Sequence, residues 1–252
     1  MKRNFHLNVN YQVTYKIVWI TYKVDMEIFQ IENFRFLRIS RMPNIIVSLR
    51  GVKCFSILDV EERKRFMRKN FGVKGYRDFN QVHGTAIFQE THDPTLNYDG
   101  FLVSENNFAY GLKTADCIPL ISWNDDLTNL MGLHCGWKGL SKGIIEESFG
   151  KFSGFDLCNT YMGPHISKKF FEVKEDLIEK FSKQGENLQS FLSSVDGVIR
   201  LDITRLCLDK ISKINAKNMV QQSLCSYANS ELFYSWRRDQ EKDRRNITIT
   251  WL

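Results

Sequence analysis

The sequence has few of the residues that divide or cross-link a chain. Only four of its 252 residues are proline, and no stretch rich in proline, glycine or serine divides it. No C-x-x-C pair is present, which argues against the usual structural zinc motifs. The G-x-G-x-x-G, Walker, H-E-x-x-H, G-x-S-x-G and H-x-E…P-C-x-x-C signatures are absent as well. We therefore predict a single domain whose chemistry does not depend on any of these signatures.

Long apolar runs are also missing. The apolar-rich segment 13–24 is short and is interrupted by Lys16 and Lys23. Its alternation predicts a strand, and neither a membrane span nor a secretory segment. Six cysteines are scattered along the chain without a signal peptide, which indicates reduced thiols. These features predict a cytoplasmic protein without a membrane partner.

The net charge of +6 comes with two dense basic runs, at Arg63–Lys69 and Arg237–Arg245. We interpret both as solvated faces, because zinc-finger spacing and an arginine-rich tail are lacking. The sequence therefore predicts no nucleic-acid partner. A local basic cluster that binds a small anion such as phosphate remains open.

Residues 26–252 are predicted to form a single layered domain, and residues 1–25 an extension of uncertain status. Residues 26–31 indicate a hairpin, and Tyr98-Asp99-Gly100 indicates a turn. Helices are expected at 59–69, 140–152, 172–183 and 202–214. Strands are expected at 81–89, 108–112, 118–123, 130–134, 232–236 and 247–252, and a further strand is expected to end at 161–164. Strands and helices mix without a regular βαβ period, so we predict an α/β protein of mixed α+β type rather than a doubly wound fold.

Three short segments each carry one plausible metal ligand. They are Gln81-Val82-His83-Gly84, Thr114-Ala115-Asp116-Cys117 and Leu133-His134-Cys135-Gly136. Two imidazoles and one thiolate are the ligand set of a catalytic zinc site with an open fourth position. Two alternatives stay open, an inert buried thiol and a Cys117 nucleophile paired with histidine. Cys135 should point away from His134 if the segment is a strand, and we expect it in the core.

Several neighbouring residues are candidates for supporting roles. Asp116 is a candidate to orient a metal-bound histidine or to cap a turn. The Gly136-Trp137-Lys138-Gly139 turn opens a predicted helix, where backbone N–H groups and Lys138 favour an anion. Arg63, Arg237 and Arg238 are candidate phosphate clamps because guanidinium is a forked donor.

Read together, these segments resemble the laccase-domain family, first labelled multicopper polyphenol oxidoreductases and later recognised as purine nucleoside phosphorylases. The similarity extends over residues 60–252. It includes Q-V-H-G at 81–84, D-G at 99–100, T-A-D-C-I-P at 114–119, H-C-G-W-K-G at 134–139, G-P at 163–164, F-E-V at 171–173 and F-Y-S-W-R-R-D at 233–239. Lys138 stands where the family has arginine, and His165 stands at a position that is usually small or cysteine.

The resemblance implies an α/β/β/α domain, a metal held by His83, Cys117 and His134, and turnover of adenosine, inosine, guanosine and methylthioadenosine. It also implies an arginine near the site at Arg63, and it makes Asp99 a candidate for substrate binding. The chain has only five histidines, and none of them forms an H-x-H pair. These are too few ligands for a full laccase cycle.

The sequence therefore predicts a zinc-dependent purine nucleoside phosphorylase with adenosine deaminase activity, monomeric or a small homo-oligomer. The catalytic candidates are Cys117, Arg63, Asp116 and Lys138. The phosphate or substrate candidates are Arg63, Asp99, Lys138, Arg237 and Arg238. The alternatives are a copper-dependent polyphenol oxidoreductase and a Cys–His hydrolase that uses Cys117.

Overall fold

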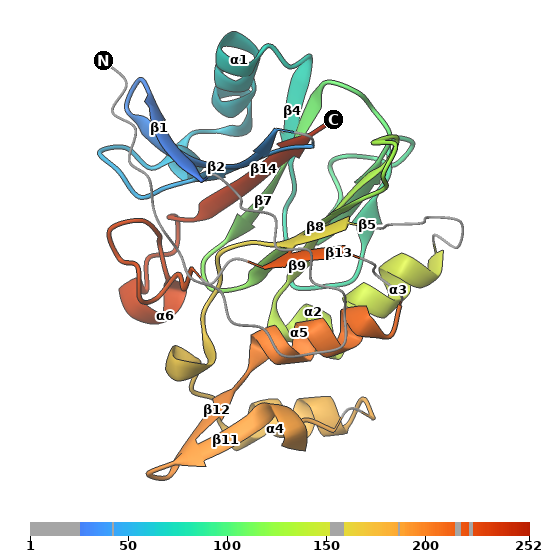
Figure 1. The fold of residues 1–252 in the computed structure, drawn as a ribbon, viewed down its shortest axis with the longest axis vertical. Coiled ribbons are helices and arrows are strands. Elements are labelled where there is room, and N and C mark those ends of the chain that lie inside the picture. The colour runs from blue at the N-terminus through green and yellow to red at the C-terminus, as the bar shows by residue number, and fades with distance from the viewer. Residues whose placement is uncertain (1–25, 42, 152–158, 186, 215–217, 222–223) are drawn as a thin grey trace.

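The computed structural model describes residues 26–41, 43–151, 159–185, 187–214, 218–221 and 224–252. Two six-stranded sheets pack face to face, and helices cover their outer faces (Figure 1). A core cluster that includes Val47, Phe101, Tyr110, Ile121 and Tyr161 lies between the sheets. The expected mixed α+β class and the α/β/β/α layering are therefore observed.

The first sheet has the strand order β1-β2-β3-β14-β7-β4. These strands are β1 (Glu27–Ile31), β2 (Phe34–Arg41), β3 (Asn44–Ser48), β14 (Asn246–Trp251), β7 (Phe108–Thr114) and β4 (Gly75–Asp78). All six residues of β14 are buried, as expected for a central strand covered on both faces. β1 and β2 form the predicted hairpin.

Helix α1 (Val60–Phe71) covers the outer face of the first sheet. Its N-terminus is closed by a capping box between Asp59 and Glu62, and it ends at Gly72 in the left-handed conformation. Its buried Phe66 and Met67 pack in an aromatic cluster against the sheet. The helix predicted at 59–69 is thus confirmed, because both its caps and its apolar face are encoded locally.

The second sheet has the order β13-β10-β8-β9-β6-β5. Its strands are β13 (Asn218–Gln221), β10 (Asn159–Met162), β8 (Ile118–Trp123), β9 (Leu130–Cys135), β6 (Gly100–Val103) and β5 (Ile87–Phe88). Every residue of β9 is buried. Burial on both faces explains why this segment reads as a continuous apolar run.

Helices α2 (Trp137–Ser141), α3 (Ile144–Lys151) and α5 (Ile203–Ser212) cover the outer face of the second sheet (Figure 1). The predicted helix 140–152 is divided into two, because Gly143 has a φ of +82° between α2 and α3. Within the described residues, none of the six helices is long and apolar enough to cross a bilayer.

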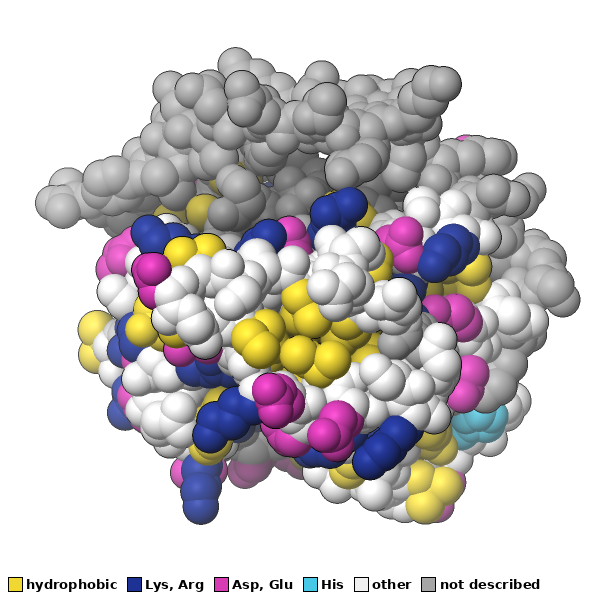
Figure 2. Space-filling model, turned by 90° about the horizontal axis from the view of Figure 1, so that it is seen from below, with side chains coloured by type: hydrophobic (Ala, Val, Ile, Leu, Met, Phe, Trp, Pro, Cys, Tyr) yellow, Lys and Arg dark blue, Asp and Glu magenta, His cyan; other side chains and the backbone are white. Residues whose placement is uncertain are grey.

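Helix α4 (Glu175–Ser182) and the hairpin of β11 (Leu192–Val195) and β12 (Val198–Leu201) lie together at one end of the molecule (Figure 1). Seen from that end, hydrophobic side chains gather near the centre of the face, with acidic and basic ones around them (Figure 2). The hairpin forms a separate two-stranded sheet. Short 3₁₀ turns η1 (Phe55–Ile57), η2 (Lys168–Phe170) and η3 (Gln189–Phe191) complete the connections.

Three local predictions are wrong or only partly right. The strand expected at 81–89 is reduced to β5, because Asp99 binds the backbone of residues 82–84 as a loop. The expected turn at 98–100 leads directly into β6. The strand expected at 232–236 is irregular and runs into α6 (Trp236–Asp239). The segment 13–24 lies outside the described residues.

Candidate metal centre and pocket

His83, Cys117 and His134 meet at one point in the fold. One ligand atom from each lies within 4.8 Å of the others. The Cys117 Sγ is 3.8 Å from His83 Nε2, and the two imidazole ring centroids are 4.7 Å apart. The structure therefore brings together the three side chains proposed from sequence as metal ligands.

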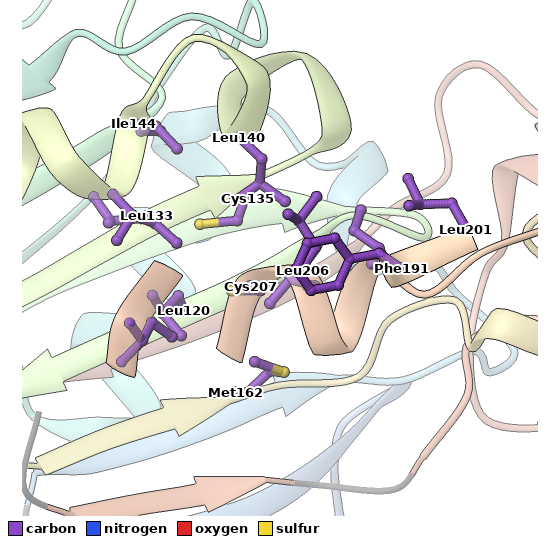
Figure 3. Packing of buried hydrophobic residues seen from close by; sticks show 14 of the residues in the cluster. Leu120, Leu133, Cys135, Leu140, Ile144, Met162, Phe191, Leu201, Leu206 and Cys207 are labelled. Atoms are coloured by element: carbon purple, nitrogen blue, oxygen red, sulfur yellow. The ribbon is translucent and has the colours of Figure 1, made fainter. Parts of the chain in front are cut away.

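The second sheet positions two of these side chains on adjacent strands. His134 lies in β9 and pairs with Pro119 of β8, while Cys117 immediately precedes β8. Cys135 is the next residue on β9 and is fully buried on the opposite face. There it lies in the core near Leu140 and Cys207, as Figure 3 shows. The strand alternation used for the sequence prediction therefore assigns the two residues to their observed faces.

The third candidate ligand, His83, lies in a loop that a buried carboxylate organises. Asp99 is fully buried and accepts hydrogen bonds from the backbone N–H groups of Val82, His83 and Gly84, at 3.1, 2.8 and 2.6 Å. Its Oδ1 is also 2.8 Å from Nδ1 of His134. One carboxylate thus sets the loop that carries the first histidine and the ring orientation of the second.

The three clustered side chains perturb one another's protonation. Burial opposes ionisation of the Cys117 thiol, but the adjacent His134 and His83 outweigh it and lower its pKa to about 6. Burial also disfavours a charged His134, yet Cys117 and Asp99 raise its pKa to about 9. Burial raises the pKa of Asp99, but His134 and the backbone N–H groups dominate and hold it below its usual value. A thiolate is the form that binds metal or acts as a nucleophile.

Gly136 lets the chain pass close to this cluster. A Cβ added there would lie 2.9 Å from both Cys117 Sγ and His83 Cδ2. These distances are shorter than van der Waals contact, so a larger residue would displace the ligands. The glycine that precedes α2 is required by this close approach and not by an unusual backbone angle, since its φ is −77°.

The cluster lies in a pocket of about 1160 Å³. The pocket lining combines apolar and aromatic groups with an excess of basic ones. Aromatic side chains are Trp137, Phe171 and Trp236; basic side chains are Lys113, Lys138, Arg237, Lys242 and Arg245; acidic side chains are Asp116 and Asp243. Such a lining suits an anionic ligand that also has a flat apolar part.

Two arginines that were predicted to contact substrate form hydrogen bonds and ion pairs with other protein groups instead. Arg63 is buried outside the pocket lining, paired with Asp78 at 2.8 Å and bonded to the carbonyls of Ser56 and Leu58. Arg238 is likewise absent from the lining and bonds to backbone carbonyls and Asp239. Both side chains stabilise the structure around the pocket rather than reaching into it.

Two acidic residues are also placed differently from the sequence expectation. Asp99 has no exposed surface, and its carboxylate contacts His134 and the backbone of the loop that carries His83. Asp116 accepts from Ser226 Oγ and the Arg237 backbone N–H, both at 2.7 Å, with a φ of +91°. These bonds tie Asp116 to the 226–237 region and not to a histidine, and the carboxylate beside His134 is that of Asp99.

The remaining predicted residues lie as follows. Lys138 and Arg237 line the pocket. His165 is buried and bonds to the Gly163 carbonyl and Thr204, and burial lowers its pKa, so it is neutral there. The sequence analysis did not name Lys113, Lys242, Arg245 or Gln81 as pocket residues. In the 81–84 segment it singled out His83 and not Gln81, and it interpreted the basic run at 237–245, which contains Lys242 and Arg245, as a solvated face. Lys113 lies in no local pattern that marks chemistry.

The chain belongs to the family described as multi-copper polyphenol oxidoreductase laccase, whose model matches residues 57–252. A purine nucleoside phosphorylase, YfiH, of Shigella flexneri is 27% identical over 176 residues, which cover 68% of this chain and 72% of that protein. Adenosine deaminase RL5, from an unknown prokaryotic organism, is 26% identical over 148 residues, 56% of each chain.

The fold of this chain is also similar to that of proteins with solved structures. The crystal structure of Bacillus licheniformis hypothetical protein YfiH aligns with a TM-score of 0.74 at 18% identity and covers 86% of this chain and 96% of that one. This likeness supports the layered architecture. The relatives' names point toward nucleoside chemistry and the family description toward copper, so the site must decide between them.

Proposed function

We propose that this protein is a zinc-dependent purine nucleoside phosphorylase with adenosine deaminase activity. The observation that carries the proposal is the His83–Cys117–His134 cluster in a pocket lined by aromatic and basic side chains. Its reaction converts adenosine, inosine, guanosine or methylthioadenosine and phosphate to the free base and a pentose 1-phosphate. We assign it to the cytoplasm as a monomer or small homo-oligomer.

The donor set fits a zinc ion. Nδ1 of His134 is engaged by Asp99, which leaves Nε2 as the nitrogen available to a metal. Cys117 has a thiol that ionises readily, and His83 Nε2 faces its sulfur. Three protein ligands leave one position for water or substrate, as in catalytic zinc sites. A bound zinc ion would supply Lewis-acid polarisation and a water of lowered pKa.

The pocket residues have distinct roles in this reaction. Trp137 and Phe171 offer flat apolar surfaces on which a purine ring stacks. Basic side chains hold the phosphate and neutralise its charge as the glycosidic bond opens. Loss of the purine leaves positive charge on the ribose ring, and an adjacent phosphate anion stabilises that transition state electrostatically.

The adenosine deaminase activity is supported by the name of one relative and by the same ligand set. Deamination replaces the amino group at C6 by a water oxygen and releases ammonia. It requires no phosphate. The two activities are therefore separable by omitting phosphate from the assay.

A copper phenol oxidase is disfavoured by the placement of the histidines. An oxidase with several coppers needs many imidazole ligands, whereas among the described residues one three-ligand group is present. His92 accepts from the Gln89 backbone, and His165 is engaged by Gly163 and Thr204. Metal analysis of protein purified without added copper distinguishes the two: two or more coppers per chain would favour the oxidase.

The decisive experiment uses zinc-loaded protein with inosine, with and without phosphate. We expect hypoxanthine and ribose 1-phosphate only when phosphate is present, and no product from the His83→Ala protein. Ammonia release from adenosine without phosphate tests deamination. Absence of phosphate-dependent base release from all four nucleosides would show that the proposal is wrong.

A further inference from the structure

The pocket has two walls that come from different layers of the fold. Trp137 and Phe171 belong to the side of the second sheet, and Lys138 follows Trp137 on α2. Lys113 lies in β7 of the first sheet, and Arg245 immediately precedes β14 of that sheet. We call Lys113, Lys242 and Arg245 the basic wall. Lys113 and Arg245 belong to the first sheet and its edge, whereas Trp137 and Phe171 pack against the core of the second sheet.

Lys113 is held in place by a chain of buried charges. Its Nζ lies 2.9 Å from Asp78 Oδ1, and Asp78 Oδ2 accepts from Arg63 Nε and Tyr76 Oη, both at 2.8 Å. The side chains of Arg63 and Asp78 are only 6% and 4% exposed. Asp78 is shared by two cations, Arg63 and Lys113, so the three side chains together keep one net positive charge at the edge of the pocket. The structural role of Arg63 therefore extends to the pocket, because it fixes the carboxylate that orients this lysine.

The backbone of Lys113 is hydrogen-bonded to the loop that carries His83. Gln81 Nε2 donates to the Lys113 carbonyl at 2.9 Å, and Gln81 Oε1 accepts from its N–H at 2.8 Å. Gln81 is two residues from His83, and Lys113 is four residues from Cys117. These two hydrogen bonds join Lys113 to the segment that carries His83, and both Gln81 and Lys113 line the pocket that contains the cluster.

Arg245 adds a second preorganised cation. Its Nη1 donates to the carbonyls of Glu241 and Arg244, at 2.9 and 2.7 Å, and its guanidinium lies 5.8 Å from the ring centre of Trp236. Its backbone N–H donates to Ser56 Oγ at 2.8 Å. Because Nη1 is anchored, the Nε–Nη2 edge is held in one orientation, and this edge is one that binds two oxygens of one phosphate.

Lys138 is a weaker candidate for the same role. It is exposed, and its Nζ lies 5.6 Å from the Trp137 ring centre, while Lys180 lies 5.4 Å from the same ring. An exposed ammonium group loses side-chain entropy on binding and is screened by water. α2 has only five residues, so its N-terminal dipole adds little.

The chemistry of phosphorolysis also requires phosphate and purine to bind on different walls of the pocket. In a single displacement, a phosphate oxygen forms a bond to C1′ as the C1′–N9 bond breaks. The bonding electron pair leaves with the purine, and the proton of hydrogen phosphate ends on the base. Nucleophile and leaving group lie on opposite faces of C1′, so phosphate and purine need different walls. Lys138 shares a wall with Trp137, whereas Lys113 and Arg245 do not.

We propose that Lys113 and Arg245 form the phosphate subsite, and that the purine occupies the Trp137–Phe171 side. This assignment rests on the proposed phosphorylase function. Inorganic phosphate is the ligand, and the ribose lies between the walls over the His83–Cys117–His134 cluster. The buried Arg63–Asp78 pair positions Lys113 and does not touch substrate.

The test compares Lys113→Gln and Arg245→Gln with Lys138→Gln, which removes a charge from the opposite wall. We expect the first two to raise the phosphate KM by about tenfold or more, the usual effect of losing a charged hydrogen bond. The inosine KM should change less than the phosphate KM. Lys113→Arg should restore much of the phosphate affinity. A larger effect of Lys138→Gln on the phosphate KM would overturn the assignment.

A binding measurement separates failure of this inference from failure of the proposed function. Inorganic phosphate is titrated calorimetrically into zinc-loaded wild-type, Lys113→Gln and Lys138→Gln proteins, with thermal unfolding as the check on folding. We expect the Lys113→Gln protein to lose affinity selectively. Equal phosphate binding by all three would refute the subsite even if phosphorolysis occurs. Selective loss without phosphorolysis in the wild type would support the anion site and refute the phosphorylase.

Discussion

The Asp99 carboxylate lies 2.8 Å from Nδ1 of His134 and also 2.8 Å from the backbone nitrogen of His83. These contacts join two histidines that are 51 positions apart in sequence. A buried carboxylate of this kind sets ring orientation and raises the basicity of the ligand nitrogen. The candidate metal centre therefore depends on a residue that is itself not a candidate ligand.

Replacing Asp99 with asparagine should weaken zinc binding by about 10–100-fold, the usual effect of losing a residue that supports a metal ligand. The asparagine amide would also turn a donor toward the N–H groups of Val82 or Gly84. Competition with a zinc indicator measures the affinity. Asp126→Asn is the matched control, because Asp126 caps an exposed turn at Thr128. Equal affinities for the two variants would count against the role of Asp99.

Alanine at His83, Cys117 or His134 should abolish stoichiometric zinc binding and both activities, because a three-ligand site has no spare protein donor. Cys135→Ala is the control on the opposite face of β9 and should retain zinc. It leaves a small void in the core, so a loss of roughly 1 kcal/mol in the free energy of unfolding is expected. The zinc content of each variant, measured by elemental analysis, tests this prediction. Loss of zinc in Cys135→Ala but not in Cys117→Ala would reverse the two thiol assignments.

Gly136→Ala should disrupt the cluster while leaving the fold intact. The added Cβ would lie 2.9 Å from Cys117 Sγ and His83 Cδ2, and overpacking of this kind costs roughly 1–3 kcal/mol. We expect weaker zinc binding and a modest fall in thermal stability. Gly150→Ala is the control, because nothing lies within 4 Å of a Cβ there. Zinc affinity unchanged in Gly136→Ala would contradict the close approach.

In metal-free protein, the Cys117 thiol should react with iodoacetamide across a pH range set by its lowered pKa of about 6. The reaction rate should be near its plateau at pH 7.5 and fall as pH decreases through 6, because only the thiolate reacts. An ordinary thiol would instead show a midpoint near pH ~8.5. Peptide mapping against the Cys117→Ala protein identifies the labelled site.

Zinc should protect Cys117 from the same reagent, because the sulfur becomes a ligand. This comparison also tests the Cys–His hydrolase alternative, in which Cys117 is a free nucleophile beside His83. Rapid labelling of Cys117 in protein that contains one zinc per chain would favour the hydrolase. Slow labelling that recovers after chelation would favour the metal site.

Some of this site follows from local sequence. His83, Cys117 and His134 each lie in a short segment of ligand-type and small residues, and alternation along 130–135 places His134 and Cys135 on opposite faces. The α1 helix follows from its capping box and terminal glycine. These features depend on residues within a few positions of one another, and the repeat of a strand or helix is readable from sequence alone.

The tertiary structure decided the rest. Local pattern does not distinguish Asp99 from Asp116 as the partner of His134, because that contact spans 35 positions and depends on how β6 and β9 pair. Likewise, Arg63 is buried against Asp78, while Lys113 on β7 and Arg245 just before β14 reach the pocket. Charge type is set by sequence, but whether a charged side chain is enclosed in the interior or reaches a pocket is set by the packing of distant strands.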